Sequence, residues 1–422
     1  MPASGQADDQ TSHAHKSPPP DVQWLRSAAA VRERCRLVYD WVAQGRSPHF
    51  TLDEDRLRDV AAYVADVTRA NYPDLAIPYH SRWRHLCAGG IDRWGELETR
   101  LAGVNAVERA RAAIDLATVS VLLDAGAGDA WRYREPATGR VFARSEGLAV
   151  ASIDMFRAGG FSGDPDQPLR ADSVGLRSMS AEMLARHFQV APDNPLVGVE
   201  SRAALLRGLG RAIETRPDLF GSPPARPGHI VDHLRASGRE VSAPALLALL
   251  LDVLSPIWPS GAVVGGSLLG DAGRHRAVLA AHAADQVVPF HKLTQWLTYS
   301  LIEPLESAGL RVVDLDGLTA LAEYRNGGLL VDLGVVRPRR LLDPAQKHDV
   351  DSELIVEWRA LTIVLMDRLL DPVRRSLALD NAFTLPQLLQ GGTWSAGRKI
   401  ALALRPPHGP PPIAIDADGT VF

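Results

Sequence analysis

Cysteine is scarce in this chain: Cys35 and Cys87 are the two cysteines among 422 residues. Two cysteines are too few for a disulfide framework or a cysteine-rich zinc site. No run of about 18 uncharged apolar residues is present, which excludes a transmembrane helix of the ordinary kind. The net charge of −4 lacks the basic excess typical of proteins that bind nucleic acids or anionic membranes. Residues 1–20 lack the apolar core of a signal peptide. These absences predict a cytoplasmic protein with two reduced thiols and with neither a nucleic-acid nor a membrane partner.

Nucleotide-binding and metal-binding motifs are missing as well. The loop Asp124–Asp129 contains two glycines, but it follows a helical pattern rather than a strand. It lacks both the P-loop lysine and the glycine spacing of a Rossmann fold. Asp271 and His275 are four residues apart and would share one face of a helix, yet no third ligand is spaced to complete a metal site. The sequence therefore predicts no cofactor and no metal.

The composition is that of a globular protein with a large core, since 46% of the residues are hydrophobic and 23% are charged. Residues 1–20 are polar and rich in proline, so we expect a disordered N-terminal tail. The proline-rich segment 221–229 is the best boundary between an N-terminal helical lobe, residues 21–220, and a C-terminal helical lobe, residues 221–422. We expect the two lobes to form one structural unit.

Helical periodicity dominates the chain from Val22 onward. An alternating pattern with a Pro-Ala-Thr-Gly turn predicts a β-hairpin over residues 131–145. Strand-like residues around an Asp-Gly turn predict a short strand pair within residues 412–422. Gly391 and Gly392 predict the end of one helix before another begins. The predicted class is therefore mainly α: a compact multi-helix fold with small β additions.

Residues 288–360 combine strongly apolar, helix-period sequence with charged side chains. Burying a charge is unfavourable unless the charge is paired, so these residues form either buried ion pairs or a functional site. A helix that begins near Pro289 would place Lys292, Gln295 and Tyr299 on one face.

A second helix, over residues 317–325, is expected to contain Glu323 in apolar surroundings. Such surroundings raise the pKa of a carboxyl group unless a cation pairs with it, and Lys292 and Arg325 are the available cations. A Lys292–Glu323 pair is either a structural ion pair or the coupled pair of a hydrolase site. The sequence alone leaves both interpretations open.

Five further charged residues have two interpretations each. Asp316 or Asp314 can cap the helix that follows, and both are also candidates for the site. Arg82, Arg84 and Arg93 lie close together in a segment that contains Gly89 and Gly90. They either satisfy carbonyl groups at a helix junction or form an anion clamp.

Long and unusual strings in this sequence resemble the uracil catabolism protein 4 family. They include VPFHKLTQWLTYSLIEPL, LTALAEYRNGGLLVDLGVV and GGTWSAGRKIA. The same likeness is carried by the segments that contain LVGVESRAALLRGLG, WRYREPATGRVFARSEGLAVASIDMF, ELIVEWRAL and the terminal DGTVF. It covers nearly all of the chain from about residue 25 onward.

A weaker likeness connects the chain to the queuosine salvage proteins. Those are helical enzymes, related in fold to DNA glycosylases, that hydrolyse the N-glycosidic bond of a modified nucleoside 5′-phosphate. That family carries an aspartate where Glu323 stands and a tyrosine where His291 stands, which puts the role of Glu323 in question. The matching positions are Pro289, Phe290, Lys292, Gln295, Asp314, Asp316, Leu318, Thr319, Glu323, Tyr324, Arg325, Gly334, Glu353, Glu357, Arg359 and Ala360.

Together the two resemblances imply one function. The uracil catabolism family belongs to a pathway in which a ring-opened nucleotide would leave urea attached to ribose. Cleaving that C1′–N bond requires an N-glycosidase. The expected substrate is N-ribosylurea or its 5′-phosphate, a small molecule; the resemblance leaves open whether the protein is a homo-oligomer.

An N-glycosidase needs a carboxylate beside C1′ and a donor for the departing nitrogen, because its transition state resembles an oxocarbenium ion. We assign the carboxylate to Glu323, with Asp316 as the alternate, and expect Lys292 to hold it ionised or to assist the leaving group. The expected substrate-binding residues are Arg325, Arg82 and Arg84 for a phosphate, Asp124 and Glu146 for ribose or urea, and Tyr324, Gln295, Asp314 and Glu357.

Three other functions remain in competition. The first is a ring-opening or ureido C–N hydrolase, which usually needs a metal or an activated serine or cysteine. The second is a non-catalytic scaffold for other enzymes of the pathway, in which the charges of residues 288–360 form a buried network. The third is a DNA glycosylase, which would require a basic face. An accessible cavity lined by Lys292, Glu323 and Arg325 would favour the enzyme.

Overall fold

Helices form most of the molecule, which confirms the predicted mainly α class. The computed structural model describes residues 18–258, 262–279, 286–343 and 346–416. The predicted N-terminal tail therefore falls almost entirely outside the described residues. The α-helices are α1 Pro20–Leu25, α2 Ala28–Ala43, α3 Leu57–Asn71, α4 Arg82–Leu86, α5 Arg93–Thr99, α6 Ala106–Leu122, α7 Arg144–Arg157, α8 Ser173–Arg177, α9 Ala181–His187, α10 Val199–Glu214, α11 Pro217–Phe220, α12 Ile230–Ser237, α13 Ala243–Leu254, α14 Lys292–Ser307, α15 Tyr324–Asp332, α16 Glu353–Leu377, α17 Leu385–Leu388 and α18 Trp394–Leu404.

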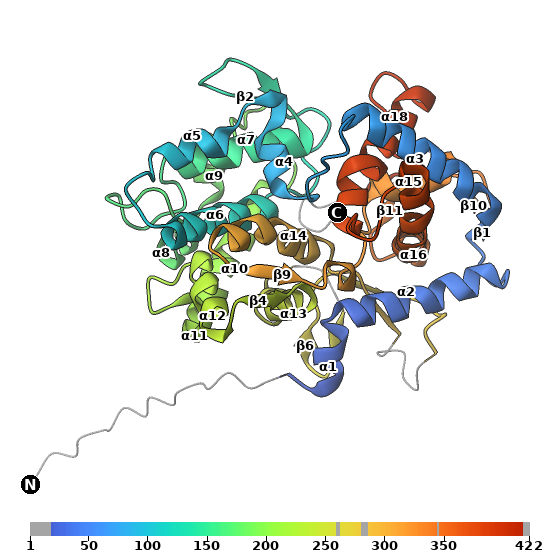
Figure 1. Ribbon diagram of the computed structural model, residues 1–422, viewed down its shortest axis with the longest axis horizontal. Helices are drawn as coiled ribbons and strands as arrows, with labels where there is room; N and C mark the ends of the chain where they lie inside the picture. Colours follow the sequence, from blue (N-terminus) through green and yellow to red (C-terminus); the bar gives the residue numbers. More distant parts are fainter. Residues whose placement is uncertain (1–17, 259–261, 280–285, 344–345, 417–422) are drawn as a thin grey trace, which may run out of the picture.

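The helices are arranged around α14, which packs against α6 near the centre of the molecule (Figure 1). Helices α4, α5 and α7 to α12 lie on one side of this pair, and α15, α16 and α18 lie on the other (Figure 1). The early helices α2 and α3 cross to the second side, where both pack against α16. The lobe boundary at 221–229 stays a prediction, and these contacts join its two sides.

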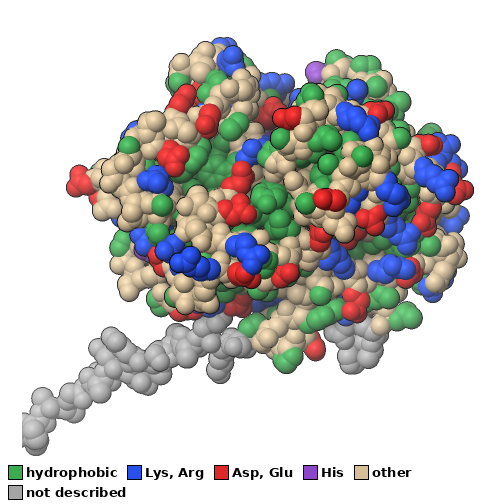
Figure 2. All heavy atoms as spheres, viewed as in Figure 1, with side chains coloured by type: hydrophobic (Ala, Val, Ile, Leu, Met, Phe, Trp, Pro, Cys, Tyr) green, Lys and Arg blue, Asp and Glu red, His purple; other side chains and the backbone are tan. Residues whose placement is uncertain are grey.

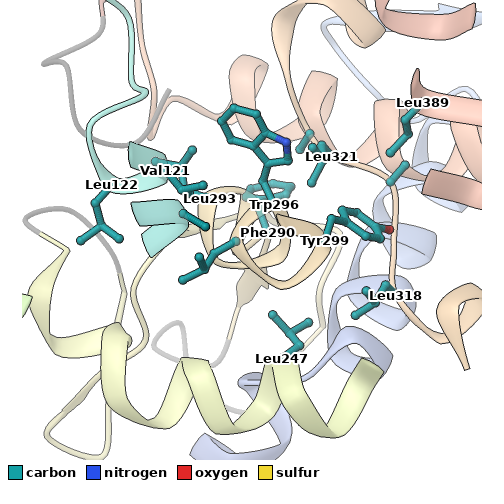
Figure 3. Packing of buried hydrophobic residues seen from close by; sticks show 14 of the residues in the cluster. Val121, Leu122, Leu247, Phe290, Leu293, Trp296, Tyr299, Leu318, Leu321 and Leu389 are labelled. Carbon is teal, nitrogen blue, oxygen red and sulfur yellow. The ribbon is translucent and has the colours of Figure 1, made fainter. Parts of the chain in front are cut away.

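One large hydrophobic cluster runs through both sides of the molecule and includes residues from α2 to α18. Figure 3 shows its centre, where Leu293, Trp296 and Tyr299 project from α14. Trp296 extends toward Leu321 and Tyr299 toward Leu318, both from the segment before α15 (Figure 3). All five side chains are buried. The core thus reaches the segment that carries the candidate site.

The strands form short two-stranded sheets that fasten distant parts of the chain together. The predicted hairpin is confirmed: β2, Tyr133–Arg134, pairs antiparallel with β3, Val141–Phe142. The other pairs are β1 Phe50–Leu52 with β10 Val336–Pro338, β4 Glu240–Ser242 with β9 Arg311–Val313, β5 Val263–Val264 with β6 Ser267–Leu268, β7 Ala272–Arg274 with β8 Val287–Pro289, and β11 His348–Asp349 with β12 Ile415–Asp416.

Two local predictions were wrong. Asp271 and His275 do not share a helix, because they flank strand β7. Gly391 and Gly392 do not end a helix: they lie in a π-helical turn, Leu389–Thr393, that joins α17 directly to α18. A Cβ atom on Gly392 would lie 2.5 Å from side-chain atoms of Thr68 and Val64, so the glycines allow α3 to pack closely here.

The predicted C-terminal strand pair falls partly outside the described residues. Within them, β12 pairs in parallel with β11 rather than with a strand that follows it. None of the described helices has the length and apolarity needed to cross a bilayer. Figure 2 shows basic and acidic side chains interspersed over the face in view, with no continuous basic area there.

Candidate active site

The candidate site lies where α14 and α15 begin and α6 ends. Strand β8 runs through Pro289, and His291 then adopts a left-handed conformation (φ 49°) as the N-cap of α14. Lys292 is consequently the first residue of the helix, three residues later than the predicted start near Pro289. This turn places the lysine side chain at the helix N-terminus, beside the residues that precede α15.

Glu323 is the N-cap of α15 rather than a residue inside a helix, which corrects the predicted helix over 317–325. Its carboxylate accepts a hydrogen bond of 3.3 Å from the backbone N–H of Asn326. The preceding segment stays irregular because side chains of α14 bind its backbone. Gln295 Oε1 accepts from the Thr319 N–H at 3.0 Å, and the Tyr299 hydroxyl donates to the Thr319 carbonyl at 2.8 Å.

Lys292 and Glu323 form an electrostatically coupled pair, and both side chains remain partly exposed. Burial raises the pKa of Glu323 to about 7, although Lys292 and Arg325 act to lower it. Burial lowers the pKa of Lys292, and the Glu323 carboxylate opposes this shift. A carboxyl group that titrates near neutral pH suits both acid and base catalysis. The partial exposure of both groups is unlike a fully sealed structural ion pair.

Asp124, at the end of α6, adds a second carboxyl group that interacts with both Lys292 and Glu323. It forms an ion pair with Arg82 and accepts a hydrogen bond of 2.6 Å from the Ser145 hydroxyl. The same hydroxyl lies 2.9 Å from Nδ1 of His85. Burial raises the pKa of Asp124, and the Arg82 guanidinium opposes that shift.

The three arginines of the predicted clamp do not gather at one anion site. Arg82 is fully buried and donates to Asp124 and to the Ser120 hydroxyl at 2.7 Å. Arg84 instead pairs with Glu303. Arg93 binds Glu135 with hydrogen bonds of 2.6 and 2.9 Å and donates to the carbonyls of Leu86 and Ala88. For Arg93 the helix-junction interpretation is the one that the contacts support.

Several other predicted site residues lie away from the Lys292–Glu323 pair. Asp316 is exposed, pairs with Arg374 at 3.3 Å and accepts from the N–H of Leu385, the first residue of α17. It therefore binds the start of α17, whose N-cap is Thr384, rather than capping the helix that carries Glu323. Asp314 is exposed and left-handed (φ 60°). The charges that act most strongly on the pKa of Lys292 and Glu323, apart from each other, are instead those of Arg325, Arg359, Asp271 and Asp124.

Glu357 and Gln295 are held by buried protein partners. Glu357 is fully buried against Ser47 and against His275 Nε2 at 3.1 Å. Gln295 is fully buried and bound to Thr319. These contacts favour structural roles for both side chains.

The remaining predicted residues are Arg325, Tyr324 and Glu146. Arg325 is buried, donates to the Gly409 carbonyl at 2.9 Å and stacks 4.8 Å from the ring centroid of Tyr324, which is partly exposed. Glu146 lies 3.4 Å from Arg398 of α18. Arg398 is exposed and is one of the cations that lower the pKa of His85.

An aromatic cluster beside the site was missed by the sequence analysis. The ring of His85 lies 5.4 Å from Trp296 and 5.9 Å from Trp394, between ring centroids. Burial holds the pKa of His85 well below its ordinary value, so the imidazole is neutral at physiological pH. Trp296 follows Lys292 by one helical turn, a spacing that could have signalled its place. Trp394 comes from a distant segment, and no local pattern connects it with this site.

Some buried nitrogen atoms around the site lack a hydrogen-bond partner among the described residues. They are Nη2 of Arg82, Nε1 of Trp296 and Nε of Arg325. Unpaired buried donors are uncommon in native proteins and often face a site that binds water or a ligand. Within the described part of the chain, no three His, Cys, Asp or Glu side chains lie close enough to hold a metal ion.

The matches to known proteins extend over nearly the whole chain. The sequence model of the family described as "Protein of unknown function (DUF1688)" matches residues 24–422. The chain belongs to the DUF1688 family. One similar protein, "Uracil catabolism protein 4" of Lachancea kluyveri, is 38% identical over 439 aligned residues, which cover 95% of this chain and 99% of the relative. "Protein urg3" of Schizosaccharomyces pombe is 39% identical over 411 residues, with the same coverage. The resemblance to the uracil catabolism protein 4 family is confirmed; the weaker one to queuosine salvage enzymes stays a prediction.

Proposed function

We propose that this protein is an N-glycosidase of uracil catabolism that hydrolyses N-ribosylurea, or its 5′-phosphate, to urea and the sugar. The name of the Lachancea kluyveri relative supports the pathway. The observation that carries the chemistry is the partly exposed Lys292–Glu323 pair, in which Glu323 has a pKa of about 7. Surface carboxyl groups ordinarily titrate near pH 4, so this one has been shifted into the range where proton transfer is efficient.

In the proposed reaction, the bond between C1′ and the urea nitrogen breaks and leaves positive charge on the ribose ring. The ionised Glu323 stabilises that charge and orients a water molecule toward C1′. The water supplies hydroxide to C1′, and its remaining proton passes to Glu323. The departing urea nitrogen takes up a proton, for which the Lys292 ammonium is the nearest assigned donor. Transfer of the proton from the neutral Glu323 carboxyl to the neutral Lys292 amine then restores both groups, so that the hydroxyl of the water ends on ribose and its other proton is replaced on urea by the one that Lys292 gave up.

The contacts change which residues we assign to substrate binding. Arg82 and Arg325 are buried and donate to other groups of the protein, although one nitrogen of each has no partner among the described residues, so an exposed guanidinium is better suited to take up a phosphate. Arg398 is exposed beside Glu146 and lies close enough to His85 to affect its titration. We assign the 5′-phosphate to Arg398 and the ribose hydroxyls to Asp124, which is hydrogen-bonded and oriented by Ser145.

The test is release of urea from synthetic N-ribosylurea, with and without the 5′-phosphate, by wild type, Glu323→Gln and Glu306→Gln. Glu306 is an exposed residue in the last turn of α14, at the opposite end of that helix from Lys292, so its variant controls for loss of a carboxylate away from the site. We expect wild type and Glu306→Gln to release urea and Glu323→Gln to be slower by about 10²–10⁴-fold. A preference for the phosphorylated compound that Arg398→Ala removes would support the phosphate assignment.

Absence of urea release by well-folded wild type from both compounds would overturn the proposal. A ring-opening hydrolase would instead consume a cyclic ureide without ribose. A scaffold would consume neither and would bind another enzyme of the pathway.

A further inference from the structure

The two-stranded ribbon of β7 and β8, which leads into α14, is fastened to α16 at both ends of β7. Asp271, just before β7, accepts hydrogen bonds of 2.8 Å from both terminal nitrogens of Arg359. His275, just after β7, pairs with Glu357, which lies two residues before Arg359 on α16. Between them Gly273 packs so closely that a Cβ atom would lie 2.4 Å from Val356. The ribbon therefore has a fixed place on α16.

Asp271 also binds the residues that begin α14. Its carboxylate accepts the backbone N–H of Lys292 at 2.9 Å. Its carbonyl accepts the N–H groups of Phe290 and His291, each at 3.0 Å. The Arg359 guanidinium stacks over the Phe290 ring, 4.0 Å from its centroid. The backbone N–H groups of three consecutive residues at the start of α14 thus all bind Asp271. Asp271 is held in turn by a bidentate hydrogen-bonded ion pair with Arg359.

We propose that Asp271 and Arg359 are positioning residues: together they fix the first turn of α14 so that the Lys292 side chain faces Glu323. This proposal rests on the proposed function in one respect, the catalytic role of the Lys292–Glu323 pair. Neither residue needs to touch the substrate. Both are buried, with exposed fractions of 6% for Asp271 and 3% for Arg359.

The chemistry of the pair suits positioning better than stabilisation. A buried ion pair often contributes no more to folding than apolar residues of the same size. The planar guanidinium, however, holds a carboxylate in one orientation through two parallel bonds, which a lysine or an apolar contact cannot do. His291 has an αL conformation, which is strained for a residue with a Cβ atom, and its N–H is one of the groups bound by Asp271.

The test separates positioning from a simple charge effect by the direction of a titration shift. The charged groups that act on Lys292 are Glu323, Arg359, Asp271 and Asp124. If Asp271 and Arg359 acted only through their charges, Asp271→Asn would lower the pKa of Lys292 and Arg359→Gln would raise it. If they position the side chain, both variants separate Lys292 from Glu323, and both lower its pKa, by about one unit.

The titration can be read directly, because the chain contains four lysines: Lys16, Lys292, Lys347 and Lys399. Protein labelled with ¹³C at the lysine ε carbon gives few signals in an NMR titration, and loss of one signal in Lys292→Arg assigns Lys292. His275→Gln is the matched control, since it removes the buried bond at the other end of β7. We expect it to lower the melting temperature and leave the Lys292 titration in place.

Shifts in the same direction for Asp271→Asn and Arg359→Gln, absent from His275→Gln, would support the proposal. Shifts in opposite directions, or none, would overturn it. If either single variant does not fold, the double variant Asp271→Asn/Arg359→Gln decides, because it leaves no unpaired charge. If only charge matters, the opposite effects of the two substitutions on the pKa of Lys292 cancel in the double variant. If the residues position Lys292, the double variant lowers that pKa by as much as a single variant does.

An activity measurement adds a second arm. With N-ribosylurea as substrate, we expect the positioning variants to lower kcat by about tenfold with KM little changed, because Lys292 acts in the transition state. Should wild type not hydrolyse this compound, the proposed function fails while the titration still decides the positioning role.

Discussion

At the scale of single residues, the ionised form of Glu323 that the proposed reaction needs is expected to lower the stability of the folded protein. Its pKa lies near 7 in the folded protein, above its ordinary value of 4.5, so the folded state binds its proton more tightly than the unfolded state. The neutral form is thus favoured by folding. The contribution of the protonated Glu323 to the free energy of unfolding is fully present below about pH 4.5 and is lost as the pH rises through 7. Glu323→Gln keeps an acceptor for the N–H of Asn326 and removes the charge.

We therefore expect Glu323→Gln to melt higher than wild type at pH 8.5, by on the order of a few degrees, and to match it at pH 5. Thermal unfolding followed by circular dichroism at both values measures the difference. A variant that melts lower than wild type at pH 8.5 would show that the ionised carboxylate stabilises the fold, as in a structural ion pair.

The pH dependence of catalysis follows from the same two residues. Because the proposed role needs an ionised Glu323, kcat/KM for N-ribosylurea should rise with pH and level off above about 7. It should fall again at higher pH, as Lys292 loses its proton below its ordinary pKa of 10.5. Initial rates between pH 5 and 10 give both limbs. A rate that is constant from pH 5.5 to 8 would exclude Glu323 as the group that must ionise.

The Lys292–Glu323 pair could be predicted from the sequence because two charges in apolar surroundings require a partner. The exclusion of Asp316 could not, since its partners Arg374 and Leu385 lie about 60 residues further along the chain. The same holds for Asp124, whose interactions with the pair arise only when α6 packs beside α14.

At the scale of elements, periodicity located helices well where an apolar stripe faces the core. It failed where side chains from other elements replace backbone hydrogen bonds. The segment before α15 was predicted as part of a helix over residues 317–325, yet Gln295 and Tyr299 bind its backbone in an irregular form. Short strands such as β7 carry too few residues for an alternating pattern to be read.

The π-helical turn at Leu389–Thr393 is the element whose perturbation we expect to reach the site. It joins α17 to α18, which carries Trp394 and Arg398, and π turns often occur at functional sites. Gly392→Ala would place a Cβ atom 2.5 Å from Thr68 Oγ1 and 2.8 Å from the Val64 carbonyl. We expect a cost of about 1–3 kcal/mol in the free energy of unfolding, measured by urea denaturation, with reduced turnover.

Gly103→Ala is the matched control for this variant. Gly103 is exposed, and an added Cβ atom there would meet nothing within 4 Å. Its effect should stay within about 0.5 kcal/mol. An equal loss of stability in both variants would show that the close packing against α3 is not what requires glycine at position 392.

At the scale of the whole molecule, the chain returns on itself in a way that the sequence did not predict. Helices α2 and α3 come early in the chain but pack against α16, while β1 pairs with β10 nearly 300 residues later. Parallel β4 and β9 make a further link across the middle of the sequence. Periodicity carries no information about such long-range pairing, because it reports only which face of each element is apolar.

These links, together with one hydrophobic cluster that spans both sides, lead us to expect a single cooperative unfolding transition. Far-UV circular dichroism reports the helices, and tryptophan fluorescence reports packing on both sides of the molecule, from Trp131 to Trp358. Their melting midpoints should coincide. Two separated transitions, or a protease-resistant fragment released by cleavage within residues 221–229, would show instead that the two predicted lobes fold independently. Because α2 and α3 complete the surface of α16, a fragment comprising residues 221–422 is expected to expose that apolar surface and to aggregate.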